Sequence, residues 1–277
     1  MTGETSGLQL TEKNNTPYFY LPLWEESKVC GHGFSTRFIE AGGEKRRPFD
    51  MGFKSGRKPE TILENRRRFF SVWDRDPQDF FCGDQVHSDK IALVGSREID
   101  AELRIFPMTD ALITADKRAV LGALCADCLL IFFLEPEIPV AAIAHAGWRG
   151  TCKGIAWQVV EIMKKKFAAN PDRIQALFSP SIAPCCYEVG TEVIESCKHS
   201  AWSREMVLHE SGRLGHSYFD LQASNRNILI QAGLKTANIF DNNLCTKCDH
   251  NMFFSYRGAG GNFSGSHLGI IFLRDMR

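Results

Sequence analysis

The chain has 277 residues, and its 33 basic and 33 acidic side chains give a formal net charge of zero. A neutral chain has no long-range attraction to nucleic acid or to an anionic membrane, which argues against binding driven by charge. The apolar fraction of 44% and the charged fraction of 24% are typical of a globular protein and exclude disorder over most of the length.

The sequence also predicts where the protein is located. The N-terminal residues are polar and lack the apolar core of a secretory signal. No apolar run reaches the roughly 18–20 residues that a membrane helix needs. The ten cysteines are too sparse for a disulfide scaffold, so most should be reduced thiols. We therefore expect a cytoplasmic protein without a membrane partner.

The first quarter of the chain predicts few regular elements. Residues 1–15 have no periodic apolar pattern and are expected to be disordered, whereas residues 16–277 are expected to form a single domain. Residues 40–60 combine glycines, prolines and cations, which is typical of a long surface loop. Residues 60–73 then carry apolar side chains at helical spacing and predict a helix.

The middle of the chain predicts a buried sheet. Residues 119–126, 129–134 and 140–146 are short apolar runs bounded by turn signals, and we interpret them as buried strands of one sheet. Residues 151–167 follow with one apolar stripe and with lysines near the end. This pattern indicates an amphipathic helix whose cations lie near the negative end of its dipole.

The last third continues the mixture. Residues 174–179 predict a strand, and residues 219–233 predict a helix with Asp220 as N-cap and Gly233 as its stop. Residues 252–256 and 268–273 predict closing strands. Because helices and strands alternate without a strict βαβ order, we expect an α+β fold: a single domain of layered mixed β-sheets flanked by helices.

Three residues have side chains that bind metals: His87 in the segment DQVHSD, Cys128 where two of the apolar runs break, and His145 near the end of the next run. They lie too far apart in the sequence for a local zinc finger, but a site assembled from distant segments is typical of catalytic metals. Two imidazoles and a thiolate suit zinc and would also bind copper. Two alternatives stay open: Cys128 is a nucleophile with His145 as its base, or the three residues are only structural.

Other cysteines could form a second site. Cys125/Cys128 and Cys245/Cys248 are two Cys-x-x-Cys pairs, but their separation is far outside the spacing of a zinc ribbon. Cys125 also lies inside an apolar run and is expected to face the core. The adjacent pair at positions 185–186 lies in a Pro-rich loop and is expected to pack rather than to bind a metal.

Three arginines are candidates for binding an anion. Arg149 lies between a strand and a helix start, and Arg37 and Arg257 lie in glycine-flanked turns. A guanidinium group matches phosphate or carboxylate with two hydrogen bonds. The alternative for each is a solvated surface arginine.

At this point several motifs together resemble one family. The chain is similar to the laccase-domain or multicopper polyphenol oxidase family, whose members are now described as purine nucleoside phosphorylases. The resemblance covers about residues 31–272, and several motifs in order make it specific. The motifs are His87 in QVHS, Asp127-Cys128 in ADC, His145 in HAGWRG, the SPSIAPCCYEVG loop, Asp220 in FDL, Cys245-Thr246, and FFSYRG.

The resemblance implies a fold and an activity. The implied fold is an α+β sandwich similar to toxin-type cysteine hydrolase domains. The family's two histidines and one cysteine map onto His87, Cys128 and His145 as metal ligands. Members phosphorolyse adenosine, inosine, guanosine and methylthioadenosine and deaminate adenosine, and they were earlier assigned copper-dependent phenol oxidation. Purine nucleosides and phosphate are therefore the expected partners, and nucleic acid is not.

The resemblance also gives expected roles. We expect Asp127, Cys128 and Arg149 to act in catalysis, with Asp127 as a proton shuttle or as a residue that orients a ligand. Arg37, Tyr256 and Arg257 are expected to bind substrate. The bound metal is expected to be zinc, with copper possible at the same site.

The chain departs from the family at positions that could contact substrate. The family's second arginine after serine-tyrosine-arginine is Gly258 here, and a later family arginine is Ser266. An early family asparagine corresponds to Asp50. These changes leave a further alternative open, a metal-binding scaffold without turnover. Phenol oxidation by several coppers is disfavoured, because the chain has only eight scattered histidines.

Overall fold

The computed structural model describes residues 7–40, 46–101 and 104–275. Within these ranges, most strands belong to two large mixed sheets, one of seven strands and one of six. The strands of the seven-stranded sheet, in spatial order, are β1 (Gln9–Lys13), β2 (Thr16–Tyr20), β3 (Cys30–Ser35), β18 (His267–Leu273), β10 (Val120–Cys125), β6 (Phe80–Gly83) and β8 (Ile105–Phe106). Those of the six-stranded sheet are β17 (Ile239–Phe240), β13 (Gln175–Phe178), β11 (Leu129–Glu135), β12 (Val140–Ala146), β9 (Ala111–Thr114) and β7 (Ile91–Leu93).

The remaining elements surround this pair of sheets. The strands outside the two large sheets are β4 (Phe38–Glu40), β5 (Arg46–Pro48), β14 (Glu188–Gly190), β15 (Val207–Glu210) and β16 (His216–Asp220). The α-helices are α1 (Pro22–Ser27), α2 (Pro59–Phe70), α3 (Ser96–Asp100), α4 (Trp148–Cys152), α5 (Ile155–Phe167), α6 (Thr191–Lys198) and α7 (Leu221–Gln231). The 3-10 helices are η1 (Phe53–Ser55), η2 (Ser71–Trp73), η3 (Pro77–Asp79) and η4 (Thr236–Asn238).

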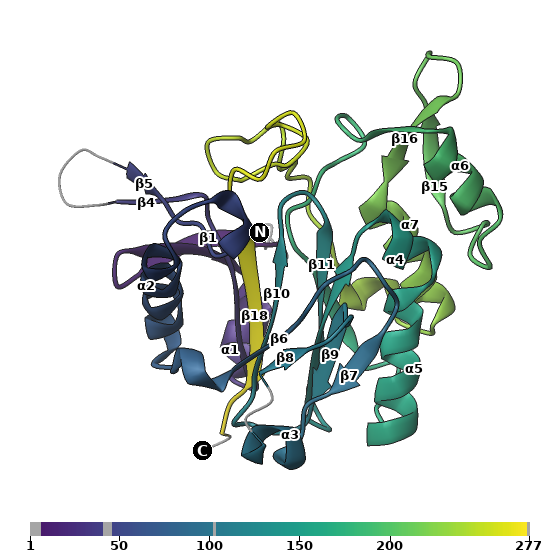
Figure 1. Cartoon of the computed structure of the whole chain (residues 1–277). Helices are drawn as coiled ribbons and strands as arrows, with labels where there is room; N and C mark the ends of the chain where they lie inside the picture. Colours follow the sequence, from purple (N-terminus) through teal and green to yellow (C-terminus); the bar gives the residue numbers. More distant parts are fainter. Residues whose placement is uncertain (1–6, 41–45, 102–103, 276–277) are drawn as a thin grey trace, which may run out of the picture.

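The layers follow from the alternation of side chains along the strands. In β11, Leu130 and Phe132 belong to the core between the two sheets, whereas Ile131 and Phe133 belong to the core under α5 and α7. Both faces of this strand are covered, which explains its continuous apolar sequence. A third core lies on the outer face of the seven-stranded sheet and includes Phe69 of α2. Figure 1 accordingly shows α2 on one side of the sheets and α5 and α7 on the other.

The predicted α+β architecture is confirmed, and most predicted elements are present with small changes of boundary. The helix expected over residues 60–73 is α2 followed by η2. The Asp220 side chain accepts a hydrogen bond from the backbone of Ala223, so it caps α7 as predicted, and Gly233 follows with a φ of 97°. None of the helices in the described ranges combines the length and the apolarity needed to cross a membrane.

Four expectations were wrong. The first apolar run is β10, which pairs with β18 and β6 in the seven-stranded sheet rather than with β11. The helix expected over residues 151–167 is interrupted between α4 and α5, because Gly154 has a φ of 73° and its backbone lies against Trp202. Residues 252–256 form turns and irregular backbone, in which Phe254 N–H donates to the His267 ring instead of to a strand.

The fourth concerns the N-terminus. Part of the segment that was expected to be disordered is β1, which pairs with β2 along its length, since a strand at the edge of a sheet needs only one neighbour. Residues 1–6 lie outside the described residues. The expected loop over residues 40–60 is interrupted by β5 and η1, and residues 41–45 also lie outside the described part.

Candidate metal and substrate site

Three separate segments meet at one end of the two sheets. His87 lies in the loop after β6, Cys128 lies in the turn between β10 and β11, and His145 lies near the end of β12. Their potential ligand atoms all lie within 4.8 Å of one another. The Cys128 Sγ atom is 3.8 Å from His87 Nε2, and the two imidazole rings meet edge to face at 4.8 Å between centroids. The structure thus brings together the three residues proposed as ligands.

The buried carboxylate of Asp110 orients this cluster. His145 Nδ1–H donates to Asp110 Oδ1 at 2.8 Å, and the backbone N–H of His87 donates to the same oxygen at 3.1 Å. The other oxygen accepts hydrogen bonds from the backbone of Val86 and from the backbone and hydroxyl of Ser88. In the neutral imidazole, a carboxylate that accepts from Nδ1–H leaves the Nε2 lone pair of His145 free for a metal. Sequence reasoning missed Asp110, because no motif marks it.

Electrostatics favour the ligand form of the thiol. Burial raises the pKa of Cys128, but the charge of His145 and hydrogen bonds with His145 and His87 outweigh it and lower the pKa to about 6. Burial lowers the pKa of His145, but the Cys128 thiolate and Asp110 raise it to about 9. Burial raises the pKa of Asp110, yet hydrogen bonds from His145 and Ser88 lower it to about 2. At neutral pH the cluster therefore holds a thiolate beside an imidazolium.

The backbone around the ligands is strained or crowded. His87 and Asp127 have positive φ angles of 61° and 104°, which non-glycine residues adopt rarely. Asp127 lies where the chain crosses from β10 in one sheet to β11 in the other. A Cβ atom at Gly147 would lie 3.0 Å from Cys128 Sγ and 3.0 Å from the His87 ring, so a larger residue would push against both side chains.

The donor set fits a transition metal. Two imidazoles and one low-pKa thiolate are ligands that zinc and copper accept. Three protein ligands also leave a coordination position for water or substrate, which is typical of catalytic rather than structural zinc.

The ligand cluster opens into a cavity of about 810 Å³. Four further residues that the sequence analysis expected to act in catalysis or to bind substrate line this cavity: Asp127, Arg149, Tyr256 and Arg257. Arg37 is not among the described residues that line it. Its guanidinium group lies over the rings of Phe38 and Phe254, and it donates to the backbone of His250. The structure therefore does not bring Arg37 together with the other proposed substrate residues.

Two neighbours hold the Asp127 carboxylate. The Thr246 hydroxyl donates to Oδ1 at 2.6 Å, and the Arg257 backbone N–H donates to Oδ2 at 2.7 Å. Burial raises the pKa of Asp127, and these hydrogen bonds only partly oppose the increase. Asp127 is thus a buried carboxyl group that faces the cavity and is held in one orientation.

The cavity wall is cationic and aromatic. Arg149 forms a 2.9 Å ion pair with Glu192, and Arg257 donates to the backbone of Glu188 at 2.7 Å. Sequence reasoning did not propose four other lining residues: Lys54 and Arg66 lie outside the motifs that it singled out, and Gln85 and Tyr187 lie inside two of those motifs but were given no role. Arg66 and Lys54 come from the N-terminal third, where the sequence predicted only a loop and a helix.

The three departures from the family pattern, Asp50, Gly258 and Ser266, lie in or near this region. Ser266 lines the cavity, and its backbone N–H donates to the buried Asp50 carboxylate at 2.8 Å. Arg57 forms a 2.9 Å ion pair with the same carboxylate. Gly258 donates to the Ser255 hydroxyl at 2.8 Å, and a Cβ atom there would lie 3.0 Å from that oxygen. A larger residue at position 258 would have to displace Ser255.

Comparisons with known proteins agree on a family. Residues 31–274 match the family model described as multi-copper polyphenol oxidoreductase laccase. Adenosine deaminase RL5, from an unknown prokaryotic organism, is 37% identical over 213 residues, which cover 76% of this chain and 81% of the relative. Purine nucleoside phosphorylase YlmD from Geobacillus stearothermophilus is 33% identical over 243 residues, or 84% and 88% of the two chains. The crystal structure of YlmD from the same species has a TM-score of 0.82 at 26% identity and covers 96% of this chain and 99% of that one.

Proposed function

This chain belongs to the multi-copper polyphenol oxidoreductase laccase family, and from that premise we propose that it is a zinc-dependent purine nucleoside enzyme. It phosphorolyses adenosine, inosine, guanosine and methylthioadenosine to the free base and ribose-1-phosphate or methylthioribose-1-phosphate, and it deaminates adenosine to inosine. The names of the relatives, purine nucleoside phosphorylase and adenosine deaminase, support this reaction class. The observation that carries the proposal is the cluster of His87, Cys128 and His145 facing a cavity of about 810 Å³.

In this proposal the three residues of the cluster hold the zinc ion. A zinc ion bound there would lower the pKa of a water molecule towards neutrality and so supply hydroxide. Asp110 keeps the Nδ1 atom of His145 protonated, and this leaves Nε2 as the ligand atom. The aromatic and apolar lining reduces the access of bulk water to the reacting atoms.

Asp127 is proposed to transfer the proton that each reaction requires. In phosphorolysis, a phosphate oxygen bonds to C1′ as the bond from C1′ to the purine nitrogen breaks, and the leaving base needs a proton. In deamination, an oxygen from water bonds to C6, and the amine needs a proton to leave as ammonia. The raised pKa of Asp127 allows it to hold a proton nearer neutral pH than an exposed carboxyl group.

The cations of the cavity wall are proposed to bind phosphate. Arg149 and Arg257 line the same cavity as the ligand cluster, and guanidinium groups bind phosphate through paired hydrogen bonds. Tyr256 lies against Phe263, with 5.0 Å between ring centroids, and offers a face on which a purine can stack. Arg37 is retained only as an indirect contributor, because it lies away from the described cavity lining.

Copper-dependent phenol oxidation is proposed at most as a side activity of the same site. A multicopper centre needs many histidine ligands, and two further buried histidines have other partners. His32 accepts from the backbone N–H of Leu21, and His267 accepts from the backbone N–H of Phe254. Burial also lowers the pKa of both rings, so they stay neutral acceptors in the core.

The test is product analysis with the zinc-loaded protein. Adenosine is incubated with and without phosphate, and products are separated by chromatography with mass detection. Adenine and ribose-1-phosphate that form only with phosphate would establish phosphorolysis, and inosine under both conditions would establish deamination. Cys128→Ala should abolish both reactions and the metal bound by the His87–Cys128–His145 cluster. Cys30→Ala, which removes the same group from a buried site on β3, should keep them. Zinc binding without turnover would contradict the proposal and favour a metal-binding scaffold.

A further inference from the structure

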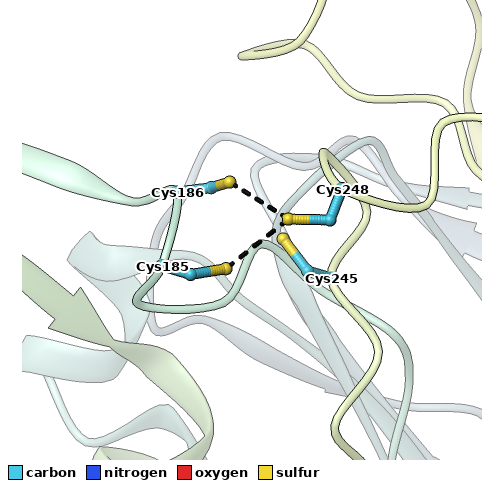
Figure 2. Close-up of side chains that lie close together, drawn as sticks. All are labelled: Cys185, Cys186, Cys245 and Cys248. Carbon is cyan, nitrogen blue, oxygen red and sulfur yellow. Dashed lines mark hydrogen bonds between the residues drawn. The ribbon is translucent and has the colours of Figure 1, made fainter.

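A second group of metal-binding side chains lies outside the cavity. The sulfur atoms of Cys185, Cys186, Cys245 and Cys248 all lie within 4.8 Å of one another. Figure 2 shows the four side chains pointing towards one point between two loops. The sulfur of Cys248 is 3.4 Å from that of Cys186 and 3.7 Å from that of Cys185. Positions 185–186 were expected from the sequence to pack rather than to bind a metal, and they were not grouped with Cys245 and Cys248.

These distances suit tetrahedral coordination. In a site with four zinc–sulfur bonds of about 2.3 Å, tetrahedral geometry places the sulfur atoms roughly 3.8 Å apart. A disulfide would need two sulfurs about 2.0 Å apart. All ten cysteines of the chain carry free thiols. The sulfur–sulfur distances therefore match those around a tetrahedral metal ion and are too long for a disulfide bond.

The backbone around Cys245 is arranged as in a metal-binding turn. The N–H group of Ala183 donates to Cys245 Sγ at 3.5 Å, and the N–H groups of Lys247 and Cys248 also hydrogen-bond to this sulfur. Three N–H donors on one sulfur stabilise a thiolate rather than a thiol. Because Cys245 is buried whereas Cys185 and Cys248 are exposed, an ion can enter from the solvent side.

We propose that Cys185, Cys186, Cys245 and Cys248 bind one structural zinc ion, separate from the His–Cys–His site. Four thiolates complete the coordination of zinc and leave no position for substrate. Among the described residues that line the cavity, none belongs to this group. The proposal does not depend on the reaction proposed above.

The ion would join two loops that hold the candidate active site. One loop follows β13 and continues from Cys186 into Tyr187, which lines the cavity. The other loop contains Thr246, whose hydroxyl donates to Asp127 and whose backbone N–H donates to Ser181 at 3.1 Å. A four-cysteine site would therefore hold the segment that orients Asp127, although Cys248 lies 63 residues from Cys185 and 62 residues from Cys186 in the sequence.

The test counts and identifies the zinc in variants of the full chain. Cys128→Ser removes a ligand of the first site, so this variant should keep one tightly bound zinc ion. X-ray absorption at the zinc edge should then show four sulfur neighbours at about 2.3 Å and no nitrogen neighbour. Adding Cys248→Ser in the same background should reduce the zinc content from one equivalent to none. Adding Cys152→Ser instead, which changes a cysteine outside the cluster, should leave one equivalent.

Three results would overturn the proposal. The first is a Cys128→Ser protein that binds no zinc after reduction and zinc loading. The second is one bound zinc ion with nitrogen neighbours in the absorption spectrum. The third is an intact mass lower by two hydrogens under non-reducing conditions together with no bound zinc, which would indicate a disulfide instead. The spectrum of the Cys128→Ser protein tests the proposal even where the Cys248→Ser variant does not fold.

Discussion

Replacing Asp110 by asparagine should change the tautomer of a metal ligand without changing the size of the side chain. One oxygen of Asp110 accepts from His145 Nδ1–H and from the His87 backbone, and the other accepts three hydrogen bonds from Val86 and Ser88. An asparagine has one acceptor oxygen, which should face the three donors. Its NH₂ group must then face Nδ1, which becomes an acceptor. In the neutral ring that binds a metal, the single proton of His145 therefore moves from Nδ1 to Nε2, the atom that would bind the metal.

Two costs follow from this change. Loss of an orienting partner of a metal-bound histidine typically weakens metal affinity by about 10–100-fold, or about 1.4–2.8 kcal/mol. The partly buried backbone N–H of His87 also loses its acceptor, which should cost about 1 kcal/mol, the lower end of the range for a fully buried unpaired donor. The substitution should therefore reduce both the metal affinity and the free energy of unfolding.

The assay is a zinc competition titration with a chromophoric chelator, together with urea unfolding of the metal-free protein. Asp116→Asn is the matched control, because Asp116 follows the opposite end of β9 and pairs with the exposed Arg118. Such a surface pair contributes about 0–1 kcal/mol, so this control should bind zinc normally. An Asp110→Asn protein with the zinc affinity of the unmodified protein would refute the role of Asp110 in selecting the tautomer.

Three more predictions test the candidate site. Gly147→Ala should lower zinc affinity about tenfold, because its Cβ atom would lie 3.0 Å from two ligand side chains. The control is Gly190→Ala, whose Cβ atom meets no atom closer than 4.0 Å and which should bind zinc normally in the same titration. The raised pKa of His145, about 9, means that zinc must displace a proton at neutral pH. Apparent zinc affinity should therefore rise about tenfold per pH unit from pH 7 to 9 and then level off, and a flat profile would contradict the assigned protonation. Thr246→Val removes a hydrogen bond that stabilises the Asp127 carboxylate, so the limb of the pH–kcat/KM profile due to Asp127 should move up by about one to two pH units. An unmoved profile would indicate that Asp127 does not titrate in catalysis.

The elements that the sequence predicted correctly are those whose signal lies in neighbouring residues. The apolar runs of β10, β11 and β12 predicted buried strands, because only strands covered on both faces are apolar throughout. Asp220 predicted the start of α7, because an aspartate side chain can accept from the backbone two or three residues on. The motifs around the three proposed ligands predicted the family, which the family model confirms.

The errors came from contacts between distant segments. Whether β10 pairs with β11 or with β18 depends on competition between strands, and the apolar pattern of β10 is the same in both arrangements. The interruption at Gly154 depends on Trp202, which comes from another part of the chain. The sequence of residues 252–256 resembles that of a strand because of Phe253 and Phe254, but these two rings are buried beneath an irregular loop.

By itself, the sequence determined the central apolar strands and the longer helices, the α+β class, the family and the three side chains proposed as ligands. These properties depend on local periodicity, on capping and on short motifs. Only the tertiary structure decided that Asp110 orients the histidines, that Arg37 lies away from the described cavity lining, and that positions 185–186 meet Cys245 and Cys248. Hydrophobic periodicity specifies which face of an element is buried, but not which distant segment covers that face, and in this protein such pairings assemble both clusters of proposed ligands.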